Sequence, residues 1–391
     1  MSLAESTPSR RNGLAQNVLH KLGAGVGVLL LSTACGRTIT AATCVGTQER
    51  CVAQELARGG SVLGTSIDSI LYASIEDRLA SPTAESSVKM ASPGTFDGSA
   101  GDHAGDMVED AWHYLEFQTR LGPRNPGSTG HRELVDFLVS ELVKSADDVQ
   151  VQPFEVAHEG AKYSMTNVSA LFKASDGRER PFILLGAHFD TRPRAECDPV
   201  PELRSSPILG ANDGASGVAV LLEIARMLAY RRPPVPVMLA FFDGEDFGAS
   251  TDWMFLGSRR YAETTNPSDV MCVLLLDMIG DEDLDIYVER YSLLSSPDLV
   301  DTVWSAAERL GHGQTFHREL GLYILDDHIP FIERGIPSID IIDFDYPYWH
   351  TTLDTADKCS PHSLRIVRDV VLEVILRGEF AGPSLHKPEG F

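Results

Sequence analysis

The sequence predicts an α/β/α sandwich, a three-layer fold whose central sheet is mostly parallel. Four apolar runs, at residues 181–190, 235–245, 270–280 and 336–345, are too short for helices and are flanked by turns. Such runs are typical of strands that are buried on both faces of a sheet. Segments with apolar residues at helical spacing occur among these runs, and this order is expected of a parallel sheet covered by helices.

The helical spacing is clearest in three segments, at residues 107–122, 131–145 and 214–232. The third follows a Gly-rich turn and is apolar over most of its length. Because the first of these segments begins at Met107, we expect a single globular domain over residues 107–391.

Residues 1–35 resemble a targeting segment rather than part of the fold. Arg10 and Arg11 precede an apolar run at residues 22–31, which is short for a transmembrane helix. Cys35 follows small residues, as in a bacterial lipoprotein cleavage site. We therefore expect export to the periplasm or the extracellular space, with a membrane anchor through Cys35 as one form. Cleavage without an anchor and an uncleaved tether are the alternatives.

Residues 36–106 are rich in Ser, Ala, Gly and Thr, and we expect a largely disordered linker there. Cys44 and Cys51 could form a disulfide in an exported protein. The later cysteines show no metal-binding spacing, and Cys272 is expected to be a buried apolar residue.

The formal net charge of −23 and the isoelectric point of about 4.8 argue against nucleic-acid binding. Proteins that bind a phosphate backbone need clustered Lys and Arg to replace its counterions. We therefore expect no nucleic-acid partner.

Carboxylates and histidines follow the predicted strands at the points where these strands end. The strand ends carry, in chain order, His188, Asp190, Glu245, Asp246 and Asp277. The turn before the third helix and two later segments add Asp213, Asp326, Asp327 and His350. Because parallel strands end at a common edge of the sheet, we expect these side chains to converge.

Some of these residues have a purely structural explanation. Asp213 is equally well placed to cap the helix that follows it, and Asp277 could serve a turn. Asp243 has no assigned chemistry and is expected to support a turn. A mixed set of imidazole and carboxylate ligands is nevertheless typical of Zn²⁺, which would also compensate the charge of the acidic cluster.

These residues, in this order, resemble the M28 family of zinc-dependent peptidases and their relatives, the glutaminyl cyclases. The resemblance covers residues 107–376. Six segments carry it: AHFDTRP (187–193), GANDGASGVAVLLEIAR (210–226), FFDGEDFG (241–248), LLLDMIG (274–280), DDHIPFIERGIP (326–337) and YWHTTLDT (348–355). The segment PRNPGSTGHRE (123–133) also resembles the cyclases. The fold that the resemblance implies is the sandwich already predicted.

The cyclase form of this resemblance implies one zinc ion. Its ligands would be Asp213, Asp246 and His350. The catalytic residues would be Glu245, Asp277 and Asp326, joined in a hydrogen-bond network. The reaction would convert the N-terminal Gln of a peptide or protein to pyroglutamate and release ammonia.

The aminopeptidase form implies two zinc ions, with His188 and Asp277 as additional ligands and Glu245 as general base. A third form is a binding domain that has lost catalysis. The cyclase is favoured because Asp326 occupies its network position and Trp349 precedes His350, as in a cyclase pocket. Substrate-binding roles are expected for Trp349, Tyr346 and Trp253. One departure is Asp246, where a Glu is more usual.

Overall fold

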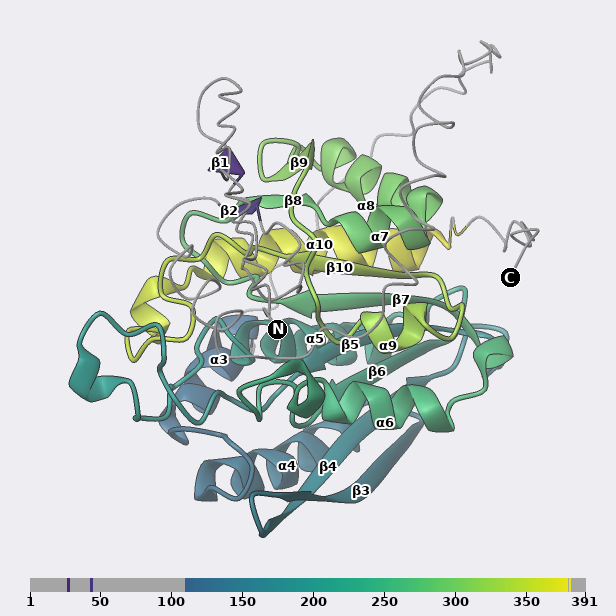
Figure 1. Cartoon of the computed structure of the whole chain (residues 1–391). Coiled ribbons are helices and arrows are strands. Elements are labelled where there is room, and N and C mark those ends of the chain that lie inside the picture. Colours follow the sequence, from purple (N-terminus) through teal and green to yellow (C-terminus); the bar gives the residue numbers. More distant parts are fainter. Residues whose placement is uncertain (1–26, 29–42, 45–109, 379, 381–391) are drawn as a thin grey trace, which may run out of the picture. The chain divides into compact units, whose positions relative to one another are not determined.

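The structure is a computed structural model and describes residues 27–28, 43–44, 110–378 and 380 (Figure 1). The chain divides into two compact units, residues 1–57 and residues 58–391. In the first unit, β1 (Gly27–Val28) pairs antiparallel with β2 (Thr43–Cys44). Most of the predicted targeting segment and linker lies outside the described residues, so these two assignments and the Cys44–Cys51 pair stay predictions.

A six-stranded sheet forms the centre of the second unit, in the order β10-β7-β5-β6-β4-β3. Its four parallel strands are the four apolar runs of the sequence: β5 (Phe182–His188), β6 (Val237–Phe242), β7 (Val270–Asp277) and β10 (Ser338–Ile342). Every residue of β5, β6 and β10 is buried. The predicted parallel sheet is therefore confirmed, and Cys272 is a buried residue of β7.

A long hairpin that the sequence analysis does not identify extends this sheet. Strand β4 (Ala161–Phe172) pairs antiparallel with β6, and β3 (Asp148–His158) pairs antiparallel with β4 at the edge. Strand β3 consists of exposed and half-buried residues only. Because β3 buries little apolar surface, its sequence carries only a weak strand signal.

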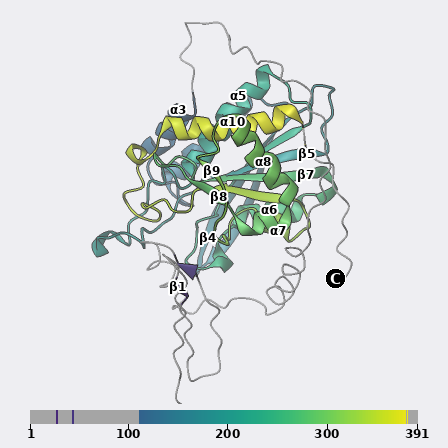
Figure 2. The ribbon, with the colours of Figure 1, turned by 90° about the horizontal axis from the view of Figure 1, so that it is seen from above.

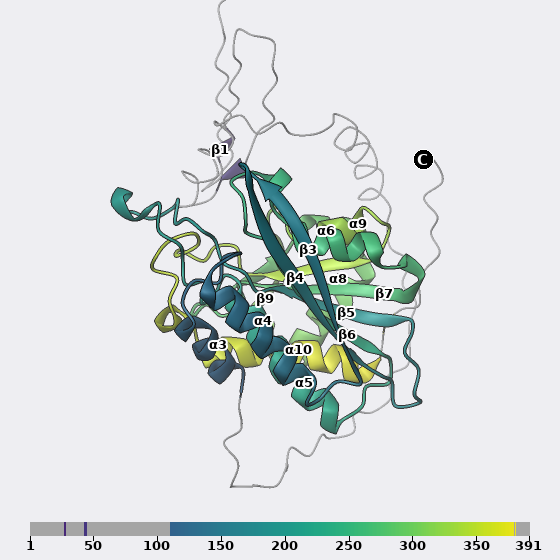
Figure 3. The same cartoon turned by 90° about the horizontal axis from the view of Figure 1, so that it is seen from below.

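Helices cover both faces of the sheet, which confirms the three-layer prediction. The larger core cluster joins one face to helices that include α3 (Ala111–Arg120), α4 (Thr129–Leu142), α5 (Ala215–Tyr230), α8 (Pro297–Arg309) and α10 (Pro361–Arg377). A second cluster joins the other face to α6 (Leu256–Thr264) and α9 (Ile329–Ile332). Figures 2 and 3 show α5 and α10 on the side of the sheet opposite α6.

Shorter elements complete the described part of the second unit. Helix α7 (Arg290–Ser295) packs against β10, and β8 (Ile286–Val288) pairs in parallel with β9 (Phe316–Leu320). The 3-10 turns within residues 110–378 are η2 (Pro201–Leu203), η3 (Thr251–Trp253), η4 (Pro267–Asp269) and η5 (Ala356–Lys358). Among the described residues, no helix is long and apolar enough to span a bilayer.

Helix α5 is the element that brings Asp213 to the sheet. Its first ten residues are all buried, and it passes so close to β7 that a Cβ on Gly217 would lie 2.2 Å from the Leu276 carbonyl oxygen. The residue before the helix, Gly214, has a φ of 98°, a conformation that favours glycine. This tight turn holds Asp213 over the ends of β5 and β7.

Candidate metal centre and active site

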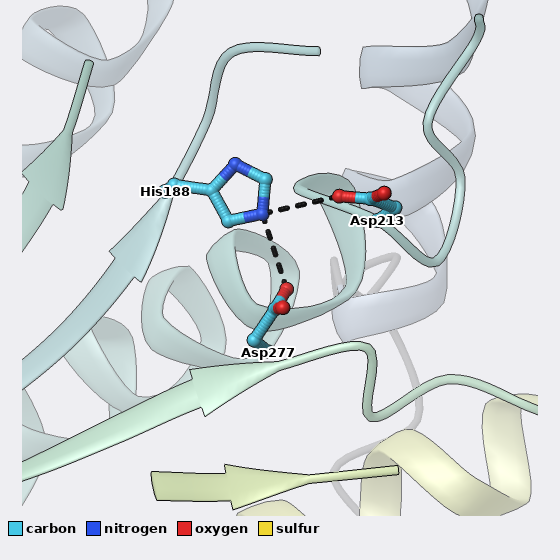
Figure 4. Close-up of side chains that lie close together, drawn as sticks. All are labelled: His188, Asp213 and Asp277. Atoms are coloured by element: carbon cyan, nitrogen blue, oxygen red, sulfur yellow. Dashed lines mark hydrogen bonds and ion pairs between the residues drawn. The ribbon is translucent and has the colours of Figure 1, made fainter. Parts of the chain in front are cut away.

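The predicted strand-end residues converge at one edge of the sheet. His188 is the last residue of β5, Asp277 is the last residue of β7, and Asp213 lies in the turn before α5. His188 Nε2 lies 3.1 Å from Asp277 Oδ1 and 3.3 Å from Asp213 Oδ1, and Figure 4 shows the two carboxylates turned toward the imidazole. Residues nearly 90 positions apart thus meet through the parallel order of β5 and β7.

A second group lies beside the first and shares Asp213 with it. His350 Nε2 is 3.4 Å from Asp246 Oδ1 and 3.8 Å from Asp213 Oδ2. In each of the two groups, His188–Asp213–Asp277 and Asp213–Asp246–His350, one potential ligand atom per residue lies within 4.8 Å of the others. The five predicted zinc ligands of the two-ion form are therefore one continuous cluster.

This cluster fits a cation by its chemistry. All five side chains are buried. Asp213 Oδ2, Asp246 Oδ2 and His188 Nδ1 have no hydrogen-bond partner within residues 110–378. Buried carboxylate oxygens without donors are costly unless a cation compensates them, and a nitrogen and oxygen donor set suits Zn²⁺. The residues fit zinc, and their individual roles as ligands stay predictions.

Two further buried carboxylates hold the loops of the cluster. Asp190 accepts hydrogen bonds from the backbone N–H groups of Glu245 at 3.1 Å and Asp246 at 3.3 Å. Asp354 accepts from the N–H groups of Asn212 at 2.9 Å and Asp213 at 3.2 Å. Both residues lie within the segments that carry the resemblance. The sequence analysis expected Asp190 to converge with the other strand-end residues, but it did not predict that Asp190 and Asp354 hold the loops, because loop-to-loop contacts are not visible in the sequence.

The pKa values of the two neighbours Glu245 and Asp246 are shifted in opposite directions. Burial, and then the charge of Asp246, raises the pKa of Glu245 well above its ordinary value. Burial would also raise the pKa of Asp246, but the guanidinium of Arg192 and the imidazole of His350 outweigh it and hold this pKa well below the ordinary value. One carboxyl therefore favours a proton and the other favours the ionised form, as a proton carrier and a metal ligand respectively require.

The third predicted catalytic residue, Asp326, lies next to the same cluster. It is buried, and burial together with the charge of Asp277 raises its pKa well above the ordinary value. Behind it, His328 lies 3.4 Å from Glu289 Oε2 and 3.9 Å from Asp340 Oδ2, and all of these side chains are buried. The structure thus adds a buried polar group that the sequence analysis did not identify.

The predicted substrate-binding aromatics have different surroundings. Trp349 is half-buried and stacks on His350, with ring centroids 3.8 Å apart. Trp253, also half-buried, packs against His158 with centroids 4.3 Å apart. Tyr346 is fully buried, and its hydroxyl donates a 2.8 Å hydrogen bond to Asp354. Tyr346 therefore supports the Asp213 turn, and the substrate roles of all three residues stay predictions.

Asp243, which the sequence left without chemistry, is paired with a histidine. His131 Nε2 lies 2.8 Å from Asp243 Oδ2, and both side chains are buried. The same carboxylate accepts a 2.6 Å hydrogen bond from the backbone N–H of Thr166. This contact joins α4 and β4 to the loop that carries Glu245, which agrees with the expected supporting role.

Comparisons with known proteins agree with the resemblance to the M28 family that the sequence motifs indicate. Residues 167–375 match peptidase family M28. A glutaminyl-peptide cyclotransferase of Drosophila melanogaster is 27% identical over 293 residues, which cover 66% of this chain and 79% of that protein.

Solved structures resemble the chain over nearly their whole length. The glutaminyl cyclase of Bacteroides thetaiotaomicron bound to N-acetylhistamine is 35% identical with a TM-score of 0.64, covering 68% of this chain and 97% of that one. The glutaminyl cyclase of Porphyromonas gingivalis is 33% identical with a TM-score of 0.65, covering 69% and 98%. A Zn-dependent exopeptidase of Parabacteroides distasonis is 35% identical with a TM-score of 0.65, covering 68% and 97%.

Proposed function

The chain belongs to peptidase family M28, and we propose that it is a zinc-dependent glutaminyl-peptide cyclotransferase. One observation carries this proposal, namely the likeness to bacterial glutaminyl cyclases over 97–98% of their chains at 33–35% identity. The proposed substrates are peptides or proteins that begin with Gln. The proposed products are the pyroglutamyl peptide and ammonia.

We propose that Asp213, Asp246 and His350 hold one zinc ion. When bound, zinc supplies Lewis-acid polarisation of the Gln γ-carbonyl group. The unpartnered oxygens of Asp213 and Asp246 support this choice of ligands. We propose that Trp349, which stacks on His350, packs against the substrate side chain.

Glu245 is the proposed proton carrier. The free α-amine forms a bond to the γ-carboxamide carbon of the same residue, and the bond from this carbon to the amide nitrogen breaks. Glu245 accepts the proton that the amine loses and returns it to the departing nitrogen, which leaves as ammonia. The raised pKa of Glu245 suits a group that must both take and give a proton. Asp277 and Asp326 would share protons with it.

A second candidate function is that of a two-zinc aminopeptidase. The observation that favours it is the additional group His188–Asp213–Asp277, which could hold a second ion. In that case Glu245 would take a proton from water rather than from the substrate amine. The nucleophile therefore distinguishes the two functions.

The decisive experiment is an assay of the purified protein on two matched peptides that differ only in an N-terminal Gln or Leu. We expect ammonia release and a mass loss of one ammonia from the Gln peptide, with the peptide otherwise intact. Release of a free N-terminal amino acid from either peptide, without cyclisation, would identify an aminopeptidase instead. Metal analysis of the same sample should give about one zinc ion per chain, because the cyclase form needs only one.

A further inference from the structure

One short segment, residues 192–198, contacts two of the proposed zinc ligands, Asp246 and His350. We propose that this segment is a brace that orients Asp246 and His350 toward a common ion, with Arg192 and Glu196 as its positioning residues. This inference rests on the proposed zinc site and adds to it two residues that bind neither the metal nor the substrate. Metal ligands are commonly fixed by such outer partners.

Arg192 fixes the orientation of Asp246. Its Nη1 lies 2.7 Å from Asp246 Oδ1, and both side chains are buried. The ion pair occupies one carboxylate oxygen, while Oδ2 is buried without a hydrogen-bond partner in the described part of the chain. The single contact from Nη1 fixes the position of Oδ1, so the remaining oxygen stays available for a cation.

Glu196 connects the same guanidinium to His350. Its Oε1 accepts hydrogen bonds from Arg192 Nε at 2.8 Å and Nη2 at 2.5 Å, and it lies 3.7 Å from His350 Nδ1. A carboxylate beside Nδ1 favours the tautomer that carries its proton there. His350 Nε2, the nitrogen that faces Asp213 and Asp246, is then left free to bind a metal.

Backbone contacts attach the brace to the loop of His350. Cys197 N–H donates a 3.1 Å hydrogen bond to the His350 carbonyl. Asp198 Oδ2 accepts from Thr352 N–H at 2.9 Å and from its hydroxyl at 2.6 Å. His350 itself has a φ of 53°, which residues other than glycine adopt rarely. The brace thus holds the carbonyl group of His350 and the loop that follows it, where the backbone needs external support.

The test measures zinc affinity directly, by competition with a chromophoric chelator on the full-length protein. Arg192→Met and Glu196→Gln are each expected to weaken zinc binding by about 10–100-fold. Arg192→Lys, which keeps the charge but loses the planar fork, is expected to restore only part of the affinity. Arg194→Met is the matched control for the arginine variants, because Arg194 lies in the same segment and is exposed.

A double-mutant cycle shows whether Arg192→Met weakens zinc binding because its contact with Asp246 is lost. With Asp246→Ala already present, Arg192→Met is expected to weaken zinc binding by less than twofold further, because the contact is already lost. Circular dichroism of each zinc-free variant checks folding. Glu196, whose side chain is 32% exposed, provides a variant that should fold even if Arg192→Met does not.

Two results would contradict the brace in different ways. If the wild-type protein binds zinc and the affinities of Arg192→Met and Glu196→Gln for zinc lie within twofold of the wild-type affinity, the brace is wrong and the zinc site stands. If wild-type protein binds no zinc, the proposed site is wrong and the brace with it.

Discussion

Three carboxylates occupy four positions at the end of β6, and two of them have a separate partner. Asp243 pairs with His131, Asp246 pairs with Arg192, and Glu245 is left to hold a proton. Mutual repulsion among buried carboxylates would otherwise be costly. A histidine, an arginine and the proposed metal therefore compensate the negative charge at this strand end, and Glu245 is the residue that we propose as the proton carrier.

Glu245→Gln tests the assignment of the proton carrier. The substitution keeps the shape and removes the titratable group, so we expect the cyclisation rate constant to fall by about 10²–10⁴-fold. Zinc content should remain that of the wild-type protein, because Glu245 is not a proposed ligand. A variant that retains its zinc and turns over at the wild-type rate would exclude Glu245 from the reaction.

His131→Gln tests the buried pair through stability. Burial lowers the His131 pKa, but the hydrogen bond and charge of Asp243 outweigh it, and the folded-state pKa is raised above 6.5. Because this pKa is raised, the protonated histidine contributes stability that is fully present below pH 6.5 and is lost as the pH rises through the folded-state value. The variant should be less stable by about 1.5–3 kcal/mol below pH 6.5, and this difference should shrink at higher pH.

Urea unfolding of both proteins across this pH range, at constant zinc, measures the difference in free energy of unfolding. His113→Gln, at an exposed position, is the control. A His131→Gln penalty that does not change with pH would show that the pair contributes through packing rather than charge.

At the scale of elements, helix α5 and strand β7 place the site by their close approach. Gly217 allows this approach, because any side chain there would meet the Leu276 carbonyl. Leu276 immediately precedes Asp277, so a change in this spacing is transmitted directly to the cluster.

Gly217→Ala should therefore destabilise the protein although alanine is the better helix former. We expect a loss of about 1–3 kcal/mol in the free energy of unfolding, as is typical of overpacking. Gly313→Ala is the matched control, because its added Cβ would meet only Glu308, with Cγ at 3.5 Å and Cα at 4.0 Å, which are ordinary contact distances. Equal unfolding free energies for the two variants would contradict a tight contact between α5 and β7.

At the scale of the molecule, the buried acidic cluster couples folding to metal binding. The three proposed zinc ligands lie at one edge of the sheet with His188, Asp277 and further buried carboxyls. A ligand that binds only the folded state stabilises it according to its concentration, by about 2.7 kcal/mol at 100 times the dissociation constant.

Removal of zinc by a chelator should consequently lower the melting temperature, and added zinc should restore it. Calorimetry over a series of free zinc concentrations measures the effect. In the Asp213→Asn variant, which lacks the carboxylate shared by both groups, the melting temperature should respond much less to zinc. An equal response in variant and wild type would place the stabilising zinc elsewhere.

The sequence alone determined much of this architecture. The parallel strands β5, β6, β7 and β10 were predictable because each lies in a mostly apolar run between turns, although Asp340 interrupts the run in β10. The residues that converge were predictable because parallel strands present their ends at one edge of the sheet. The edge strand β3 was not, since it is half-exposed and its pairing partner, not its composition, makes it a strand.

Only the tertiary structure decided which residue contacts and orients each side chain of the site. His131 and Asp243 are 112 positions apart, and Arg192 and Asp246 are 54 positions apart. Such partners follow no period of the chain, because loops and helices from separate parts of the sequence bring them together. Local motifs of the sequence therefore identify the residues of the site. The orientation and the charge of their side chains depend on contacts that exist only once the sheet is assembled.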